Sequence, residues 1–224
     1  QHGLTAVVGS FPPLLGNSLI RRKGFIEFST LGNIFQNAGY QTQFFHNGHN
    51  GFGDTDFFLK QGGFENLTDE KDFTNWKFRN ELGVCDEDLY EKVYPEIWSK
   101  KDKPKLSLIL TMSNHAPHEI PNDFKASHPE LKNLDKKEAA FYYSDYALGK
   151  FLDQCAQHSE FKNTLFLLLA DHGEIYDETD HGYKLFHIPA LLLNSSRGKG
   201  TFASTCSQVD FAPTLLSEIS FHDI

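Results

Sequence analysis

The sequence predicts an α/β fold in which a mostly parallel central sheet is covered by helices on both faces. Strand-length apolar runs alternate along the chain with segments of helical periodicity. Residues 164–170 form an almost unbroken Leu/Phe run, which is typical of a strand buried on both faces of a parallel sheet. The length of 224 residues fits one domain with a substantial core.

The first half of the chain predicts one helix followed by one strand. Residues 31–38 carry apolar side chains at helical spacing, and Gly39 can end this helix. Residues 41–45 then read as a short strand. The glycine- and histidine-rich residues 46–54 follow at the carboxyl end of that strand. We interpret them either as a candidate substrate loop or as an ordinary solvated loop.

The middle of the chain predicts a strand between two helices. Residues 86–98 form the first helix and residues 105–112 the strand. Asp135 can cap the second helix, residues 136–157. Its apolar stripe is expected at Phe141, Leu148, Leu152 and Cys155.

The last third of the chain predicts two strands and a terminal helix. The strands are expected at residues 163–170 and 189–194, and the helix begins near Asp210. No internal repeat or low-complexity tract interrupts this alternation.

Composition excludes several classes of protein. The net charge of -9 argues against a nucleic-acid partner. No apolar run approaches the roughly 20 residues that span a bilayer, and we expect no signal peptide within these residues. Because the chain begins with Gln1, we expect a processed product or an excised fragment. The three widely spaced cysteines provide no disulfide framework and are expected to be small core residues.

Side chains that can bind metal or phosphate follow the predicted strands. Asp171 and His172 come directly after one strand, and His115 follows another. His181 and His187 lie in the segment leading to residues 189–194. Parallel strands present their carboxyl ends at one edge of a sheet, so these groups can converge there.

Asp171 and His172 alone make half of a metal site. Zinc takes about four ligands and manganese about six. His181 and His187 can complete the set, or they can hydrogen-bond the anionic oxygens of a substrate. The alternative is a capping aspartate and a surface histidine in an ordinary turn. Other catalytic patterns are missing: the chain has no GxSxG, no GxxxxGK[ST] and no GxGxxG after a strand.

Eight short segments, taken in order, resemble one protein family. They are HGLTA (2–6), SFPP (10–13), GVCDEDL (83–89), TMSNH (111–115), YSDYA (143–147), ADHG (170–173), HIPA (187–190) and QVDFAPTL (208–215). Together they resemble the extracytoplasmic catalytic domain of the lipoteichoic acid synthase and phosphoglycerol transferase branch of the alkaline phosphatase/sulfatase superfamily.

This resemblance implies a site and a mechanism. A threonine side chain attacks a phosphodiester with the help of a divalent metal and forms a covalent intermediate. Asp171 and His172 match metal ligands, and His115 matches a substrate-contacting histidine. His187 matches a second substrate contact, a role for which His181 competes. The resemblance favours manganese, with magnesium and zinc as alternatives.

The resemblance also implies that residues 1–224 are a single catalytic domain missing its first strand and nucleophile segment. The nucleophilic threonine is expected just before Gln1, and a glutamate metal ligand on the first strand. Thr5 is the nearest hydroxyl in the chain, but it falls on a segment that looks helical. We therefore expect the isolated chain to be inactive and to bind metal weakly.

The implied function is transfer of a phosphoglycerol-type headgroup from a membrane phospholipid to a hydroxyl of a glycan or polyol acceptor. Upstream membrane helices would anchor the domain on the extracytoplasmic side of a membrane. Three alternatives stay open. They are a sulfatase that uses a modified cysteine or serine, a phosphoethanolamine transferase, and a non-catalytic glycan- or lipid-binding relic. The few isolated cysteines argue against the phosphoethanolamine transferases, which usually carry several disulfides.

Overall fold

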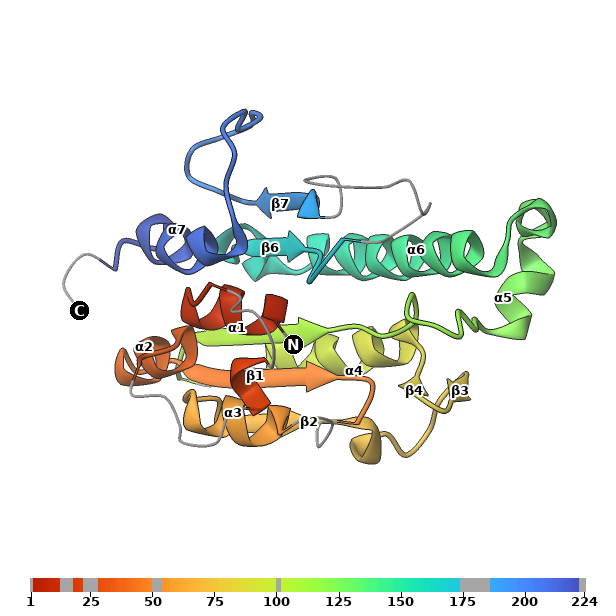
Figure 1. Ribbon diagram of the computed structural model, residues 1–224, viewed down its shortest axis with the longest axis horizontal. Coiled ribbons are helices and arrows are strands. Elements are labelled where there is room, and N and C mark those ends of the chain that lie inside the picture. The colour runs from red at the N-terminus through yellow and green to blue at the C-terminus, as the bar shows by residue number, and fades with distance from the viewer. Residues whose placement is uncertain are drawn as a thin grey trace. The chain divides into compact units, whose positions relative to one another are not determined.

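The chain folds into two compact units. Figure 1 labels their helices and strands. One unit, hereafter unit 1, contains residues 1–34 and 162–224, and unit 2 contains residues 35–161. The computed structural model describes residues 2–12, 18–21, 28–49, 54–99, 102–173 and 186–221.

Unit 2 is built on a parallel sheet with the strand order β2-β1-β5. These strands are β1 (Gln41–His46), β2 (Asn66–Thr68) and β5 (Lys105–Leu110). The register runs from Gln41 opposite Lys105 to His46 opposite Leu110, so β1 and β5 end side by side. The parallel α/β architecture expected from the sequence is confirmed, as are the strands at residues 41–45 and 105–112.

Seven shorter elements complete unit 2 and its boundaries. α2 (Leu31–Asn37) precedes β1, and α3 (Thr55–Gln61) precedes β2. η2 (Glu70–Asp72) leads to the antiparallel hairpin of β3 (Arg79–Asn80) and β4 (Gly83–Val84). α5 (Asn122–Ser127) and η3 (Pro129–Asn133) follow β5.

Two long helices of unit 2 pack against each other. They are α4 (Asp86–Trp98) and α6 (Lys136–Ala156), and their bounds match the predicted helices within one residue. The Tyr90 and Phe151 rings stack between them with centroids 4.6 Å apart. Trp98 at the end of α4 stacks on His158 at 4.2 Å, while the chain's other tryptophan, Trp76, is half-exposed.

The predicted buried face of α6 is wrong in three of its four positions. Phe141, Leu148 and Leu152 are only partly buried, and Cys155 alone belongs to the buried face. The helix instead buries Ala139, Ala140, Tyr143, Ala147, Phe151 and Cys155. Small alanines allow α6 to approach its neighbours closely, so close packing decides which face is buried.

Asp135 caps α6 as the sequence predicts. Its carboxylate accepts a hydrogen bond from the Glu138 backbone N–H at 2.8 Å, and the Glu138 side chain accepts one from the Asp135 N–H at 3.0 Å. We expect Asp135→Ala to lower the free energy of unfolding by about 1 kcal/mol, because it leaves an N–H of the first turn unsatisfied. Urea denaturation checks this, with the exposed helical Asp153→Ala as the matched control. Equal stability of the two variants would contradict the capping role.

The described residues of unit 1 form two strands and several short helices. β6 (Phe166–Leu169) pairs antiparallel with β7 (Ala190–Leu193). α1 (His2–Gly9) contacts η6 (Gln208–Asp210) and α7 (Phe211–Glu218). η1 (Leu19–Arg21) also contacts α1, and η4 (Ser159–Asn163) leads from unit 2 into this unit.

The expectation that residues 164–170 are buried on both faces is wrong for the described strand. All four residues of β6 are only partly buried. In the described part of the chain β6 has one neighbouring strand, β7, so it lies at the end of its sheet. An end strand exposes more of its side chains than a central strand, whatever its composition.

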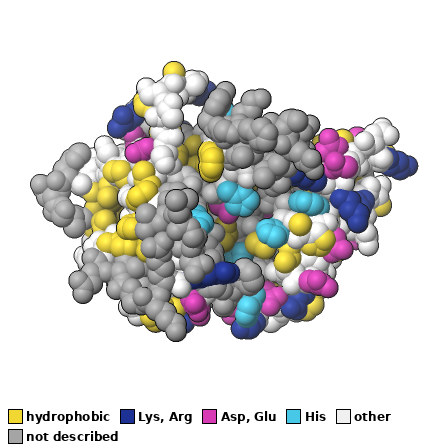
Figure 2. Space-filling view, in the orientation of Figure 1, with side chains coloured by type: hydrophobic (Ala, Val, Ile, Leu, Met, Phe, Trp, Pro, Cys, Tyr) yellow, Lys and Arg dark blue, Asp and Glu magenta, His cyan; other side chains and the backbone are white. Residues whose placement is uncertain are grey.

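Figure 2 shows acidic and basic side chains interspersed among the described residues of the visible face. Cys85 and Cys155 are buried as expected, but Cys206 is exposed, so its expected core position is wrong. No helix of the described chain is long and apolar enough to span a membrane.

Candidate active site

Asp171 and His172 follow β6 after one intervening residue, Ala170, so they lie at the end of this strand as the sequence predicts. The His172 Nε2 atom lies 3.7 Å from Asp171 Oδ1, and both side chains are open to solvent. The His172 Nδ1 atom lies 2.8 Å from the Gly173 carbonyl oxygen and donates to it, because a carbonyl can only accept. In the neutral ring this leaves the Nε2 lone pair available beside a carboxylate oxygen. One carboxylate and one imidazole at this spacing can share a divalent ion.

The backbone of Asp171 is held by two other elements of unit 1. The first is α1, because a Cβ atom placed on Gly3 would lie 2.0 Å from the Asp171 carbonyl oxygen. The second is η6, where Gln208 Nε2 donates to the carbonyl oxygens of Ala170 at 3.0 Å and Asp171 at 2.8 Å. The start of α1 therefore lies against the Asp171 backbone, and only glycine at position 3 permits this approach.

Thr5 is not available as an exposed nucleophile. It lies within α1, is 1% exposed, and donates its hydroxyl hydrogen to the His2 carbonyl oxygen at 2.9 Å. The predicted helical position of Thr5 is confirmed.

The strand ends of unit 2 contribute two histidines. His46 is the last residue of β1 and is 7% exposed, and its Nδ1 donates to the Leu110 carbonyl oxygen at 2.9 Å. Burial lowers the pKa of His46, while that hydrogen bond and the charges of Asp69, Asp86 and Glu70 partly oppose the shift.

His46 is therefore neutral near pH 7, and its Nε2 lone pair can accept a hydrogen bond. A Cβ atom on Gly48 would lie 2.8 Å from this Nε2 atom, so glycine there leaves room beside the ring.

His115 lies in a tight turn after β5, as predicted. The His115 N–H donates to the Met112 carbonyl oxygen at 3.0 Å and closes this turn. Its exposed imidazole lies with Nδ1 2.8 Å from the Ala116 carbonyl oxygen, so Nε2 again carries the free lone pair in the neutral ring. Because β1 and β5 end in register, the segments carrying His46 and His115 leave the same edge of this sheet.

The other two candidate ligands predicted from the sequence are His187 and His181. His187 is exposed in unit 1, just before β7, and His181 lies outside the described residues. Among the residues that the structure describes, no group of three or more His, Cys, Asp or Glu side chains can hold a metal ion. Asp171 and His172 lie side by side after β6, and their role as two ligands of a metal stays a prediction.

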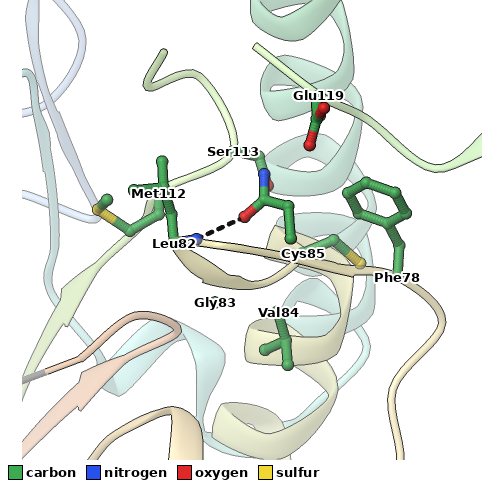
Figure 3. Close-up of a pocket in the computed structure, with 9 residues that line it drawn as sticks. Phe78, Leu82, Gly83, Val84, Cys85, Met112, Ser113 and Glu119 are labelled. Carbon is green, nitrogen blue, oxygen red and sulfur yellow. Dashed lines mark hydrogen bonds between the residues drawn. The ribbon is translucent and has the colours of Figure 1, made fainter. Parts of the chain in front are cut away.

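A small pocket lies between the β3–β4 hairpin and the turn after β5. Figure 3 shows Phe78 and Leu82 on the hairpin side, with Met112, Ser113 and Glu119 facing them. It has room for about one water molecule, so it cannot hold a phospholipid headgroup. Cys85 also lines it, and burial and the hydrogen bond to Asp88 raise the pKa of its thiol to about 12. This cysteine is not an activated nucleophile.

A sequence model described as Sulfatase matches residues 5–219. The chain belongs to the Sulfatase family. A curated relative, phosphoglycerol transferase I of Salmonella arizonae, is 27% identical over 177 residues. That alignment covers 72% of this chain and 22% of the relative. The chain therefore spans about a fifth of the relative's length.

Solved structures share the fold. A protein of the alkaline phosphatase superfamily from Vibrio parahaemolyticus is 34% identical, with a TM-score of 0.80 over 96% of this chain and 53% of that one. The lipoteichoic acid synthase LtaP from Listeria monocytogenes is 22% identical, with a TM-score of 0.82 over 96% of this chain and 58% of LtaP. The alkaline phosphatase-like fold expected from the sequence is thereby confirmed.

The position of His46 differs from the sequence prediction. The residue was expected at the start of a loop, but it is the last residue of β1 and is buried. A signal was present, because His46 follows Phe44 and Phe45 directly, just as Asp171 follows an apolar run. The same strand-end reasoning applied to residues 41–46 would have found it.

Proposed function

We propose that this chain is the catalytic part of a metal-dependent transferase. It moves a phosphoglycerol-type headgroup from a membrane phospholipid to a hydroxyl group of a glycan or polyol. The main structural support is the Asp171–His172 pair at the end of β6, with the start of α1 packed against the Asp171 backbone. Family membership and a relative named phosphoglycerol transferase I support the choice of headgroup.

The nucleophile of this proposal is a threonine just before Gln1. Gly3 lies against Asp171, so residues immediately upstream of α1 start close to the metal-ligating pair. The first strand and a glutamate ligand would lie further upstream and complete the catalytic domain. Burial of Thr5 inside α1 supports an upstream nucleophile over a nucleophile within the described chain.

Asp171 and His172 fit a divalent ion because they offer a carboxylate oxygen and an imidazole nitrogen on one side of a turn. We assign manganese, with magnesium and zinc as alternatives. When bound, the ion would lower the pKa of the nucleophile and neutralise phosphoryl oxygens.

Histidine side chains serve the substrate in this mechanism. His115 contacts the phosphoryl group, and His187 or His181 provides a second contact. The threonine oxygen forms a bond to phosphorus as the bond to the diacylglycerol oxygen breaks, and diacylglycerol leaves with a proton. The acceptor hydroxyl then attacks phosphorus, loses its proton and releases the threonine.

The protein would act at a membrane surface. We propose that upstream helices anchor it and hold the catalytic domain on the extracytoplasmic side. The acidic net charge of -9 does not oppose this placement, because an anchor outweighs surface repulsion.

A sulfatase is the second candidate, favoured by the family whose sequence model matches. A sulfatase would carry a modified cysteine or serine where the transferase carries threonine. The residue just before Gln1 therefore distinguishes the two reactions.

The decisive experiment uses a protein that extends upstream of Gln1 by about one strand and one helical turn. It is incubated with manganese and phosphatidylglycerol, and its intact mass and adduct position are measured. We expect a glycerophosphoryl group on the upstream threonine, and no adduct on the 224-residue chain alone. An unmodified extended protein that hydrolyses a sulfate ester would favour the sulfatase. Turnover by the chain alone, lost in Thr5→Ala, would overturn the upstream nucleophile.

A further inference from the structure

We propose that Asp86 is a positioning residue that fixes the two strand-end turns of unit 2. One turn follows β1 and begins after His46, and the other follows β5 and carries His115. This inference deepens the proposed function, on which the catalytic part of its test rests.

The Asp86 carboxylate accepts hydrogen bonds from residues of both turns. Asp86 is the first residue of α4 and is 1% exposed. Its Oδ1 atom accepts from Asn47 Nδ2 at 2.8 Å, from the Met112 N–H at 3.2 Å and from the Ser113 N–H at 3.0 Å. Its Oδ2 atom accepts from Ser144 Oγ of α6 at 3.1 Å. One buried side chain thereby joins the ends of β1 and β5 to α4 and α6.

The link to the His115 turn is reciprocal. While Oδ1 accepts from the Met112 and Ser113 backbones, the Asp86 N–H donates to Ser113 Oγ at 2.9 Å. Met112 is also the residue whose carbonyl oxygen closes the turn onto His115. Movement of Asp86 would therefore move the first residues of the turn that places the imidazole.

The link to the β1 turn runs through Asn47, which is fully buried and follows His46 directly. Besides Asp86, its Nδ2 atom donates to the Val84 carbonyl oxygen at 2.8 Å, and its own carbonyl oxygen accepts from the Val84 N–H at 2.9 Å. Gly83 makes this pairing possible, because a Cβ atom there would lie 1.9 Å from the Asn47 carbonyl oxygen. The residue after His46 is thus held on two sides.

Burial of a carboxylate costs desolvation free energy, so such a group is rarely placed in a core for stability alone. Asp86 has no ion-pair partner among the described residues, so its charge is stabilised by the four hydrogen bonds that it accepts. Three of these bonds come from Asn47, Met112 and Ser113, which lie in the turns that follow β1 and β5. A residue that only began α4 would not need them, and this distribution favours positioning of the turns.

The test compares three variants of the 224-residue chain by NMR of assigned imidazole signals. Asp86→Ala leaves the Met112 and Ser113 N–H groups without an acceptor, so the His46 and His115 signals should both shift. Asp86→Asn keeps an acceptor oxygen but removes the charge. Because the Asp86 charge raises the pKa of His46, this variant should lower that pKa further. The other groups acting on His46, the Leu110 carbonyl, Asp69 and Glu70, are unchanged.

Ser144→Ala is the matched control, because it removes only the bond to Oδ2. It should leave both histidine signals and the His46 titration in place. Unchanged His46 and His115 signals in folded Asp86→Ala would overturn the proposal. If that variant does not fold, Asp86→Asn decides, and a His46 titration identical to that of wild type would then overturn it.

Steady-state kinetics of the upstream-extended protein provide a second, separate test. With manganese and phosphatidylglycerol, Asp86→Ala should lower kcat by about 10²-fold with a smaller change in KM, because the contacting groups are displaced. Ser144→Ala should stay near wild type. If the wild-type extended protein has no activity, the proposed function fails, while the NMR comparison still decides the role of Asp86. An equal loss in Asp86→Ala and Ser144→Ala would overturn the assignment to the turns.

Discussion

Asp171→Ala should abolish metal uptake and turnover in a protein that extends upstream of Gln1. The replacement removes one of two side chains that the described structure offers to an ion at the end of β6. Loss of an ion that supplies several kcal/mol of charge stabilisation corresponds to a fall in turnover of about 10³-fold. Elemental analysis after dialysis measures the metal, and release of diacylglycerol from phosphatidylglycerol measures turnover.

Asp153→Ala provides the comparison for this effect. Asp153 is an exposed carboxylate of α6 in unit 2, so its loss removes the same charge without touching the Asp171–His172 pair. We expect full metal content and activity in that variant. Unchanged metal stoichiometry in Asp171→Ala would show that Asp171 is not a ligand, and the candidate site would have to be abandoned.

Gly3→Ala should destabilise unit 1 and displace Asp171. The new Cβ atom would lie 2.0 Å from the Asp171 carbonyl oxygen, a backbone atom that cannot rotate away. Moving α1 away from the Asp171 backbone to relieve this clash should lower the free energy of unfolding by about 1–3 kcal/mol. The higher helix propensity of alanine partly offsets this loss. Circular dichroism during urea denaturation measures the stability. In the extended protein, manganese titration should show about tenfold weaker binding, which corresponds to about 1.4 kcal/mol.

Gly149→Ala makes the same chemical change in α6, where a Cβ atom would meet nothing within 4 Å. It should stabilise the chain by about 0.5–1 kcal/mol, because glycine weakens a helix interior. If Gly3→Ala stabilised the protein to the same degree, α1 would not lie against Asp171. The structural support for a nucleophile upstream of Gln1 would then be lost.

Elements with strong local signals could be predicted from the sequence. α4 and α6 have continuous helical periodicity, and a capping aspartate defines the start of α6. β1 ends in Phe44, Phe45 and His46, and β5 ends in the apolar residues Leu108, Ile109 and Leu110, after which polar residues begin at Thr111. The prediction of Asp171 and His172 as ligands has the same basis, because both residues directly follow an apolar run.

Features that depend on packing could not be predicted in this way. The buried face of α6 contains alanines and a tyrosine, whose periodicity is weaker than that of the leucines at Leu148 and Leu152. The partial burial of β6 and its antiparallel pairing with β7 likewise depend on neighbours far away in the sequence. Composition alone describes the strand and not its place in a sheet.

The role of Asp86 was invisible for a related reason. In the sequence it is one of three acidic residues in the first turn of α4, where carboxylates are common. Its distinguishing partners lie 26 to 58 residues away in the chain. Only the fold separates it from Glu87, whose side chain instead forms an ion pair with Lys150.

The distribution of tryptophan determines what optical measurements of this protein report. Both tryptophans, Trp76 and Trp98, belong to unit 2, and Trp98 loses its stacked neighbour His158 when that unit unfolds. Tryptophan fluorescence will therefore report the unfolding of residues 35–161. It will not report the unfolding of the strands and helices around Asp171. A single fluorescence transition is no proof of two-state unfolding of the whole chain, and agreement with a backbone probe is required.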